Sequence, residues 1–254
     1  MDTPARPVPA LVGVGVGPGD AGLVTLRAVE ELRAADVILV PVTDTGADEV
    51  GRAEQVVLAV CPEAATRLRR IPFSMAQKRG VGTKRRLSWQ ASAEAAAEEF
   101  NNGAGRVAFA TVGDPSVYST FSYLAAHVRE AVPDLVVTVV PGITAMQALA
   151  AAGQVPLVEA QESLSLVPAT AGLDAVAEAL DHSDTVVAYK GGRQLSELLA
   201  LIRERRPDAV GVLGVNVGLP DESVQPLATV EAAAAPYFST VLVAPARPHI
   251  GGRL

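Results

Sequence analysis

Short apolar runs alternate with amphipathic stretches along most of the chain. The apolar runs, rich in valine, predict buried strands at residues 11–15, 36–40, 107–112, 135–140, 162–167, 185–189, 210–215 and 240–243. Stretches with apolar residues at helical spacing predict helices at residues 48–60, 83–100, 115–132, 171–182 and 193–205. Strands that alternate with helices predict an α/β fold with parallel pairing.

A break at Pro133-Asp134 divides these elements into two groups. Proline cannot continue the helix that precedes it, and the next strand begins directly afterwards. We therefore expect two αβ lobes, residues 1–132 and residues 133–254. A chain of 254 residues is long enough for two such domains, and a hydrophobic content of 49% is ample for their cores.

Composition and charge narrow the classes of function. The one cysteine, Cys61, excludes an intramolecular disulfide, and no Cys/His cluster points to a metal. Residues 1–10 lack the apolar core of a secretory signal, and no apolar run approaches membrane-spanning length. A net charge of −7 argues against nucleic-acid binding. We expect a cytoplasmic protein that works without metal, membrane or nucleic acid.

One junction stands out within the stretch from Val107 to Tyr123. The predicted strand stops at Gly113, and Asp114 followed by Pro115 predicts the start of a helix. Aspartate is a favoured N-cap, and proline suits the first helical position. Open α/β sheets bind ligands at the carboxyl ends of their strands, which is where this junction lies. An ordinary capped turn is the alternative interpretation.

Four predicted strands end in loops that carry glycine and a nearby polar residue. The glycines are at Gly17-Pro-Gly19, Gly113, Gly142 and Gly191-Gly192, and the polar residues are Asp20, Asp114, Thr144 and Lys190. Glycine lets a backbone approach a ligand closely, so the set favours a shared cleft over four ordinary turns. A dinucleotide motif fails because its third glycine would fall on Asp20 or Pro18, and a Walker motif is absent.

Three of these loops together resemble the signatures of the tetrapyrrole methylases. The segments are Gly15-Val-Gly-Pro-Gly-Asp20 with Leu23-Val-Thr-Leu-Arg-Ala28, then Gly113-Asp-Pro115, then Val140-Pro-Gly-Ile-Thr144. The resemblance extends from about Leu11 to Val243. It implies two αβα lobes with a ligand cleft between them and a homodimer. It also implies S-adenosylmethionine as methyl donor, which leaves as S-adenosylhomocysteine.

Within this family the chain is similar to the precorrin-2 carbon-20 methyltransferases of cobalamin biosynthesis. The similar segments are Gly113–Leu124, Glu162-Ser-Leu164, Val217–Glu222 and Tyr237-Phe-Ser-Thr240. Departures occur at Ala21, where proline is usual, and at Ala145-Met146, where Ser-Phe is commoner. The implied reaction converts precorrin-2 to precorrin-3A. The alternatives are a cobalt-factor II C(20)-methyltransferase, another corrin-ring methylase, and a non-catalytic S-adenosylmethionine-binding module.

The resemblance also implies cofactor-binding residues. Carried over by motif or by strand position, they are Pro18, Gly113, Asp114, Val117, Tyr118, Thr144, Ala145, Tyr189, Asn216 and Val241. Asp114 is also the candidate catalytic residue, because its carboxylate could offset cationic charge or receive a proton late. Its simpler role is the helix cap. For Tyr118, packing in the protein core is the alternative.

The expected substrate contacts centre on a basic segment. Residues 67–86 hold 8 of the 21 lysines and arginines and no acidic residue. Precorrin-2 bears acetate and propionate carboxylates, and a basic patch on an acidic protein can steer such a polyanion. The expected substrate-binding residues are Asp20, Arg79, Lys84, Arg85, Arg86 and Tyr123. A solvated loop and helix start is the alternative for the basic residues, and core packing is the alternative for Tyr123.

Overall fold

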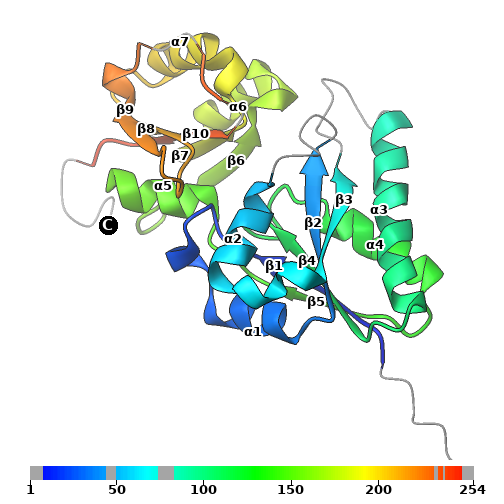
Figure 1. Cartoon of the computed structure of the whole chain (residues 1–254). Helices are drawn as coiled ribbons and strands as arrows, with labels where there is room; N and C mark the ends of the chain where they lie inside the picture. The colour runs from blue at the N-terminus through cyan, green and yellow to red at the C-terminus, as the bar shows by residue number, and fades with distance from the viewer. Residues whose placement is uncertain (1–7, 44–49, 74–82, 232–233, 237, 248–254) are drawn as a thin grey trace, which may run out of the picture. The chain divides into compact units, whose positions relative to one another are not determined.

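The protein consists of two compact units, each built on one five-stranded sheet. The computed structural model describes residues 8–43, 50–73, 83–231, 234–236 and 238–247. The first unit spans Met1–Thr144 and the second spans Ala145–Leu254. Figure 1 shows helices beside both sheets. This arrangement confirms the expected α/β class with two sheets.

All strand pairs described in the first unit are parallel. In spatial order the strands are β3 (Leu68–Phe73), β2 (Val37–Thr43), β4 (Arg106–Thr111), β1 (Ala10–Gly15) and β5 (Val136–Val140). The helices are α1 (Leu26–Ala34), α2 (Arg52–Val60), α3 (Thr83–Asn101) and α4 (Phe121–Ala131), with 3-10 turns η1 (Ala21–Leu23) and η2 (Pro62–Arg67). Parallel strands place their carboxyl ends at one edge of the sheet, which is the ligand edge of such folds.

Helices cover both faces of this sheet (Figure 1). On one face, Leu32 of α1 and Val57 of α2 cluster with Val12 of β1. On the other face, Leu124 of α4 clusters with Leu11 of β1, and α3 adds further apolar side chains. Successive side chains of a strand point to opposite faces, so β1 feeds both cores and reads as a continuous apolar run.

The sheet of the second unit is mixed. Its strands, in spatial order, are β6 (Leu164–Pro168), β7 (Thr185–Tyr189), β10 (Ser239–Ala244), β8 (Val210–Val215) and β9 (Ser223–Pro226). β6 and β7 are parallel, whereas β10 is antiparallel to β7 and β8, and β9 is antiparallel to β8. The helices are α5 (Ala145–Gly153), α6 (Leu173–His182) and α7 (Leu195–Arg205), with 3-10 turns η3 (Ala169–Ala171), η4 (Gly192–Gln194) and η5 (Leu227–Thr229).

The division between the units differs from the expected one. It falls after Thr144 rather than after residue 132. The reason is β5, which pairs in parallel with β1, so that Val137 lies opposite Leu11. The strand that follows Pro133 therefore completes the first sheet instead of opening the second. No local sequence feature of this strand indicates which sheet it joins.

Two strands do not show the pattern of apolar runs by which the others were predicted. β3 reads Leu-Arg-Arg-Ile-Pro-Phe, and β9 reads Ser-Val-Gln-Pro. Both lie at an edge of their sheet. Edge strands tolerate proline and polar side chains because one side of their backbone makes no ladder bonds. The basic segment thus begins with the last residue of η2 and continues as the strand β3.

Within the described ranges, no helix combines the length and apolar character that crossing a bilayer requires. The same residues contain no group of three or more His, Cys, Asp or Glu side chains able to hold a metal ion. Cys61 is buried, and this burial raises the pKa of its thiol, which disfavours the reactive thiolate.

Candidate functional site

The loops after β1 and β4 are joined at the carboxyl edge of the first sheet. The Gly113 amide donates to the Gly17 carbonyl at 2.7 Å, and the Gly17 amide donates to the Gly113 carbonyl at 3.4 Å. One step earlier, the Val16 amide donates to the Thr111 carbonyl at 2.9 Å. The first two sequence signatures therefore form one backbone-paired structure.

Three glycines let the loop after β5 join this pair. A Cβ atom on Gly142 would lie 2.1 Å from the Gly113 carbonyl oxygen, and a Cβ on Gly15 would lie 2.6 Å from the same oxygen. Side chains are excluded at both positions. Gly113 has a φ of 72°, in the left-handed region, yet a Cβ built on it meets its nearest atom, Thr144 Cα, only at 3.9 Å. That side of the Gly113 backbone is open to a ligand.

Asp114 fastens the loops after β4 and β5 to each other. One carboxylate oxygen accepts a hydrogen bond from the Gly142 amide at 2.9 Å. The other accepts from the Ser116 amide at 2.7 Å and from the Ser116 hydroxyl. Burial raises the pKa of Asp114, but the hydrogen bonds from Ser116 and Gly142 outweigh burial and hold the pKa below its ordinary value. Asp114 is therefore a carboxylate at neutral pH.

The expected helix cap at Asp114 is wrong. Helix α4 begins only at Phe121, and the residues between them form turns. The Ser119 hydroxyl organises the end of this loop, because it donates to Thr111 Oγ1 at 3.2 Å and accepts from the Phe121 amide at 3.2 Å. One Asp114 oxygen makes the local bond to the Ser116 amide, as in a cap, and the other makes the tertiary bond to Gly142, but no helix continues from this turn.

Sequence reasoning missed the two partners of Asp114. Gly142 lies on another strand end, so no local signal links the two residues. Ser116 could have been found, because aspartate often binds the backbone two residues further on in a turn.

Tyr118 holds a strained backbone conformation in the same loop. Its φ of 50° is in the left-handed region, which costs on the order of 1–3 kcal/mol for such a residue. Its side chain is 43% exposed, and partial burial raises the pKa of its phenol. Val117, just before it, donates its amide to the Asp114 carbonyl at 3.1 Å. Strain of this kind is typical of ligand-binding loops.

The loop after β1 presents its two predicted residues differently. Pro18 is buried, whereas Asp20 is exposed. The Asp20 carboxylate caps η1 by accepting the Gly22 amide at 2.7 Å. The exposed carboxylate of Asp20 is already bound by the backbone. This local turn therefore accounts for the presence of an aspartate here.

The second unit gathers its own strand ends. Lys190 follows β7 and Asn216 follows β8, and both have left-handed φ values, 62° and 52°. The Lys190 amide donates to the Ser239 carbonyl at 3.1 Å, and the Asn216 amide donates to the Phe238 carbonyl at 3.1 Å. Both acceptors lie at the start of β10, which brings the two strained residues to the same edge of the mixed sheet.

Helix α5 is connected to this edge through Tyr189. The Tyr189 hydroxyl accepts the Met146 amide at 3.1 Å and so satisfies a donor in the first turn of the helix. Ala145 opens that turn, and Thr144, just before it in the chain, is buried. Val241 lies inside β10 with its side chain in the hydrophobic core, so it offers a ligand no side chain.

The first arginines of the basic segment are committed to the fold. Arg67 donates to backbone carbonyls at the end of α1. Arg69 pairs with Glu99 at 3.4 Å. Arg70 binds Glu54 through two nitrogens, at 2.9 and 3.1 Å. These three cations hold β3 and the end of η2 to their neighbours, so the interpretation of the whole segment as a carboxylate-binding surface is too broad.

The remaining basic candidates are only partly placed. The structure does not describe Arg79, nor the side chains of Lys84, Arg85 and Arg86, which belong to the first turn of α3. Tyr123 of α4 is described, and it is 45% exposed rather than buried in the core. Its ring stacks on Trp89 of α3, with centroids 4.1 Å apart and planes at 8°.

Residues 10–233 match the family described as Tetrapyrrole (Corrin/Porphyrin) Methylases. The chain belongs to this family. This tetrapyrrole methylase is 33% identical over 238 residues to a precorrin-2 C(20)-methyltransferase of Sinorhizobium sp, covering 92% of this chain and 94% of the relative. It is 29% identical over 243 residues to a cobalt-precorrin-2 C(20)-methyltransferase of Salmonella typhimurium, covering 92% and 95%.

A solved structure shares the fold of this tetrapyrrole methylase. It is uroporphyrin-III C-methyltransferase from Thermus thermophilus complexed with S-adenosylhomocysteine, with a TM-score of 0.62, 20% identity and coverage of 92% of this chain and 97% of that one. The family resemblance seen in the loop motifs is thus confirmed.

The loop junction of this tetrapyrrole methylase fits a cationic methyl donor. The Gly113 backbone is open on one side, so a ligand can lie against it without meeting a side chain there. Asp114, directly after it, is ionised and places a negative charge beside that position. A sulfonium carries the opposite charge, which favours binding of the donor in its charged form.

Proposed function

We propose that the protein is an S-adenosylmethionine-dependent C-methyltransferase that methylates carbon 20 of precorrin-2 and yields precorrin-3A. The observation that carries this proposal is the junction of the three signature loops around Asp114. Relatives that align with over nine-tenths of the chain are named C(20)-methyltransferases. Their names support the choice of substrate and carbon.

When bound, S-adenosylmethionine supplies a methyl group on a positively charged sulfonium. A ring carbon of the tetrapyrrole would take this methyl group, with S-adenosylhomocysteine as the leaving group and a proton released from the product. The conjugated ring system supplies the nucleophile, so the protein needs no strong base. Its task is to hold the two reactants in line, a contribution that reaches about 7–11 kcal/mol in favourable cases.

Asp114 acts as a positioning residue in this scheme. Its lowered pKa makes it a weak base, and donors from Ser116 and Gly142 already bind both of its oxygens. Its charge stabilises the cationic donor, and its hydrogen bonds fix the loop on which Gly113 lies. The cofactor-binding residues predicted from the sequence remain our proposal for the donor site. Val241 contributes only its backbone, because its side chain lies in the hydrophobic core.

Two alternatives concern the substrate and the class of protein. Relatives include enzymes named for cobalt-precorrin-2 as well as for precorrin-2, so a cobalt-carrying substrate is the second candidate. A non-catalytic S-adenosylmethionine-binding module is the third. Incubation of the protein with methyl-labelled donor and each tetrapyrrole, without oxygen, separates the three. Label in carbon 20 of precorrin-2 supports the proposal, label only in the cobalt form selects the second, and donor binding without transfer selects the third.

We further propose a cytoplasmic homodimer. The family resemblance supports the dimer, and a soluble methyl donor made in the cytoplasm supports the location. Light scattering coupled to size-exclusion chromatography should give twice the mass of one chain, and cell fractionation should recover the protein with cytoplasmic markers. A monomer mass at assay concentrations would refute the dimer.

A further inference from the structure

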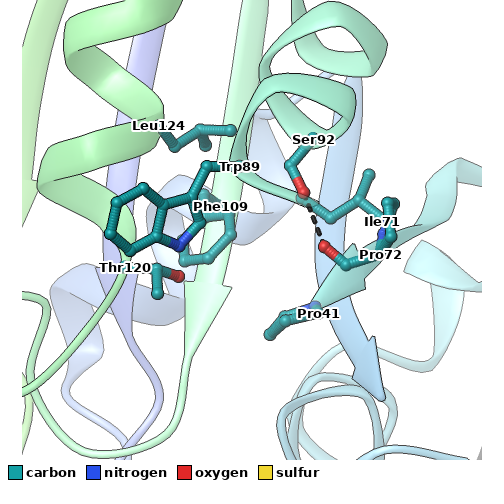
Figure 2. A pocket seen from close by; sticks show the side chains of 8 residues that line it. All are labelled: Pro41, Ile71, Pro72, Trp89, Ser92, Phe109, Thr120 and Leu124. Carbon is teal, nitrogen blue, oxygen red and sulfur yellow. Dashed lines mark hydrogen bonds between the residues drawn. The ribbon is translucent and has the colours of Figure 1, made fainter. Parts of the chain in front are cut away.

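A small cavity lies between the sheet of the first unit and helices α3 and α4. Its volume is about 10 Å³, enough for one group of about the size of a water molecule. Figure 2 shows Trp89, Phe109, Thr120 and Leu124 on one side of it, facing the ends of β2 and β3 on the other. The cavity therefore opens among the carboxyl ends of parallel strands, at the ligand edge of the sheet.

The lining is mostly apolar. Most wall residues are aromatic or aliphatic, and the polar side-chain groups are the hydroxyls of Ser92 and Thr120 and the buried indole nitrogen of Trp89. The Ser92 hydroxyl is already bound to the Pro72 carbonyl at 2.6 Å and to the Ser88 carbonyl at 2.9 Å. Apart from the Thr120 hydroxyl and the indole nitrogen, the side chains of the wall offer mainly carbon, against which an apolar group packs.

The cavity shares a wall with the loop that carries Gly113 and Asp114. Thr111 ends β4, and its hydroxyl accepts a hydrogen bond from Ser119 at the far end of the loop. Thr120, the next residue, lines the cavity and makes no side-chain cap bond to α4. The position of this wall is thus set by the same loop that forms the candidate donor site.

Trp89 closes the cavity and is backed by a half-exposed ring. The ring of Tyr123 stacks almost parallel on the ring of Trp89. Such aromatic pairs stabilise a fold by more than the apolar area they bury. Tyr123 remains 45% exposed, so the pair presents an aromatic surface to solvent beside the cavity. A flat, partly apolar macrocycle is a suitable partner for such a surface.

We propose that this cavity is a specificity subsite that receives a ring methyl group of the tetrapyrrole, with Trp89 and Thr120 as its determining walls. The inference rests on the proposed function. Precorrin-2 carries ring methyl groups that unmethylated uroporphyrinogen III lacks, and one carbon in a fitted apolar pocket changes affinity about 10–200-fold. The subsite thus selects a substrate that has already been C-methylated.

The test fills the cavity. In Thr120→Leu the longer side chain occupies the space without loss of a cap bond. Thr66→Leu makes the same chemical change at an exposed position of η2 and serves as the matched control. Calorimetric titration, without oxygen, measures the Kd of precorrin-2, uroporphyrinogen III and S-adenosylhomocysteine for each protein. The parent and the control should bind precorrin-2 at least about tenfold more tightly than uroporphyrinogen III, and Thr120→Leu should reduce that ratio towards one with the S-adenosylhomocysteine Kd unchanged.

A second measurement requires no variant. Trp89 is the one tryptophan of the chain, so its fluorescence lifetime reports on this cavity alone. Bound precorrin-2 should lower the bimolecular quenching constant for acrylamide, whereas S-adenosylhomocysteine should leave it unchanged. An unchanged ratio of the two tetrapyrroles in a folded Thr120→Leu protein, or no shielding of Trp89, overturns the subsite. Failure of the parent to methylate precorrin-2 overturns the proposed function instead, and the binding data distinguish the two.

Discussion

The Asp114 carboxylate accepts the backbone amide of Gly142 at 2.9 Å, across two loops that are 28 residues apart in the chain. This bond joins the ends of β4 and β5, which are separated in the sheet by β1. At the same point Gly142 packs against the backbone of Gly113 and Gly15 with no room for a side chain. The Asp114 carboxylate and this glycine packing together hold the loop after β5 against the loop after β4.

Asp114→Ala should lower both stability and activity. It leaves the half-buried Gly142 amide without its acceptor, at a cost of about 1 kcal/mol or more, whereas the exposed Ser116 can bind water instead. Urea denaturation should show this loss of stability, and the affinity for S-adenosylmethionine should fall with it. Asp134→Asn, at an exposed turn whose φ of 59° suits asparagine, should change neither. Full donor affinity and turnover in Asp114→Ala would contradict the positioning role.

The depressed pKa of Asp114 predicts the pH range of its effect. A carboxylate whose folded pKa is lowered contributes stability above its unfolded pKa of about 3.9, and this contribution is lost as pH falls through the folded value. The difference in unfolding free energy between the parent and Asp114→Asn should therefore be constant from pH 8 to about 5 and shrink below about pH 3.9. The pH dependence of kcat should show no ionisation of Asp114 near neutrality. A change in kcat near neutral pH that disappears in Asp114→Asn would instead identify Asp114 as a catalytic base.

Gly142→Ala should disrupt the loop junction. The new methyl group would lie 2.1 Å from the Gly113 carbonyl oxygen, and backbone cannot yield as a flexible side chain does. We expect a loss of about 1–3 kcal/mol or more, together with weaker donor binding. Gly51→Ala is the control, because its φ of −66° is ordinary and its one close contact, the Pro41 carbonyl oxygen at 3.3 Å from the new Cβ, calls for a shift of only a few tenths of an ångström. Equal melting temperatures for the two variants would show that the junction tolerates a side chain.

The basic segment should separate into two functional classes. Arg70→Ala should lower the unfolding free energy by roughly 1–2 kcal/mol, because it leaves buried Glu54 without its cation, and should leave the KM for the tetrapyrrole unchanged. Changing Arg85 and Arg86 to alanine should raise that KM, and added salt should weaken substrate binding less than in the parent. Affinity for S-adenosylmethionine should be unaffected. Equal losses for both ligands would exclude Arg85 and Arg86 as the carboxylate clamp.

Much of the first unit could be predicted from local pattern. The run at residues 107–112 is apolar at every position except Thr111, because both faces of its strand are buried, and it marks β4 to within one residue. The glycine-bearing loops could be found because a left-handed φ at Gly113 and close packing at Gly142 both require the absence of a side chain. Family membership followed from these motifs.

The sequence by itself therefore determined the α/β class, the order of most strands and helices, and the glycine-bearing loops that carry the family signatures. Only the tertiary structure decided which sheet takes β5, that Asp114 binds Gly142 as well as Ser116, and that Arg67 and Arg70 belong to the fold. Each of these outcomes is a contact between segments distant in the chain. A cap is worth only about 1 kcal/mol, so a local preference of this size does not by itself fix where a helix starts or which distant segment a side chain binds.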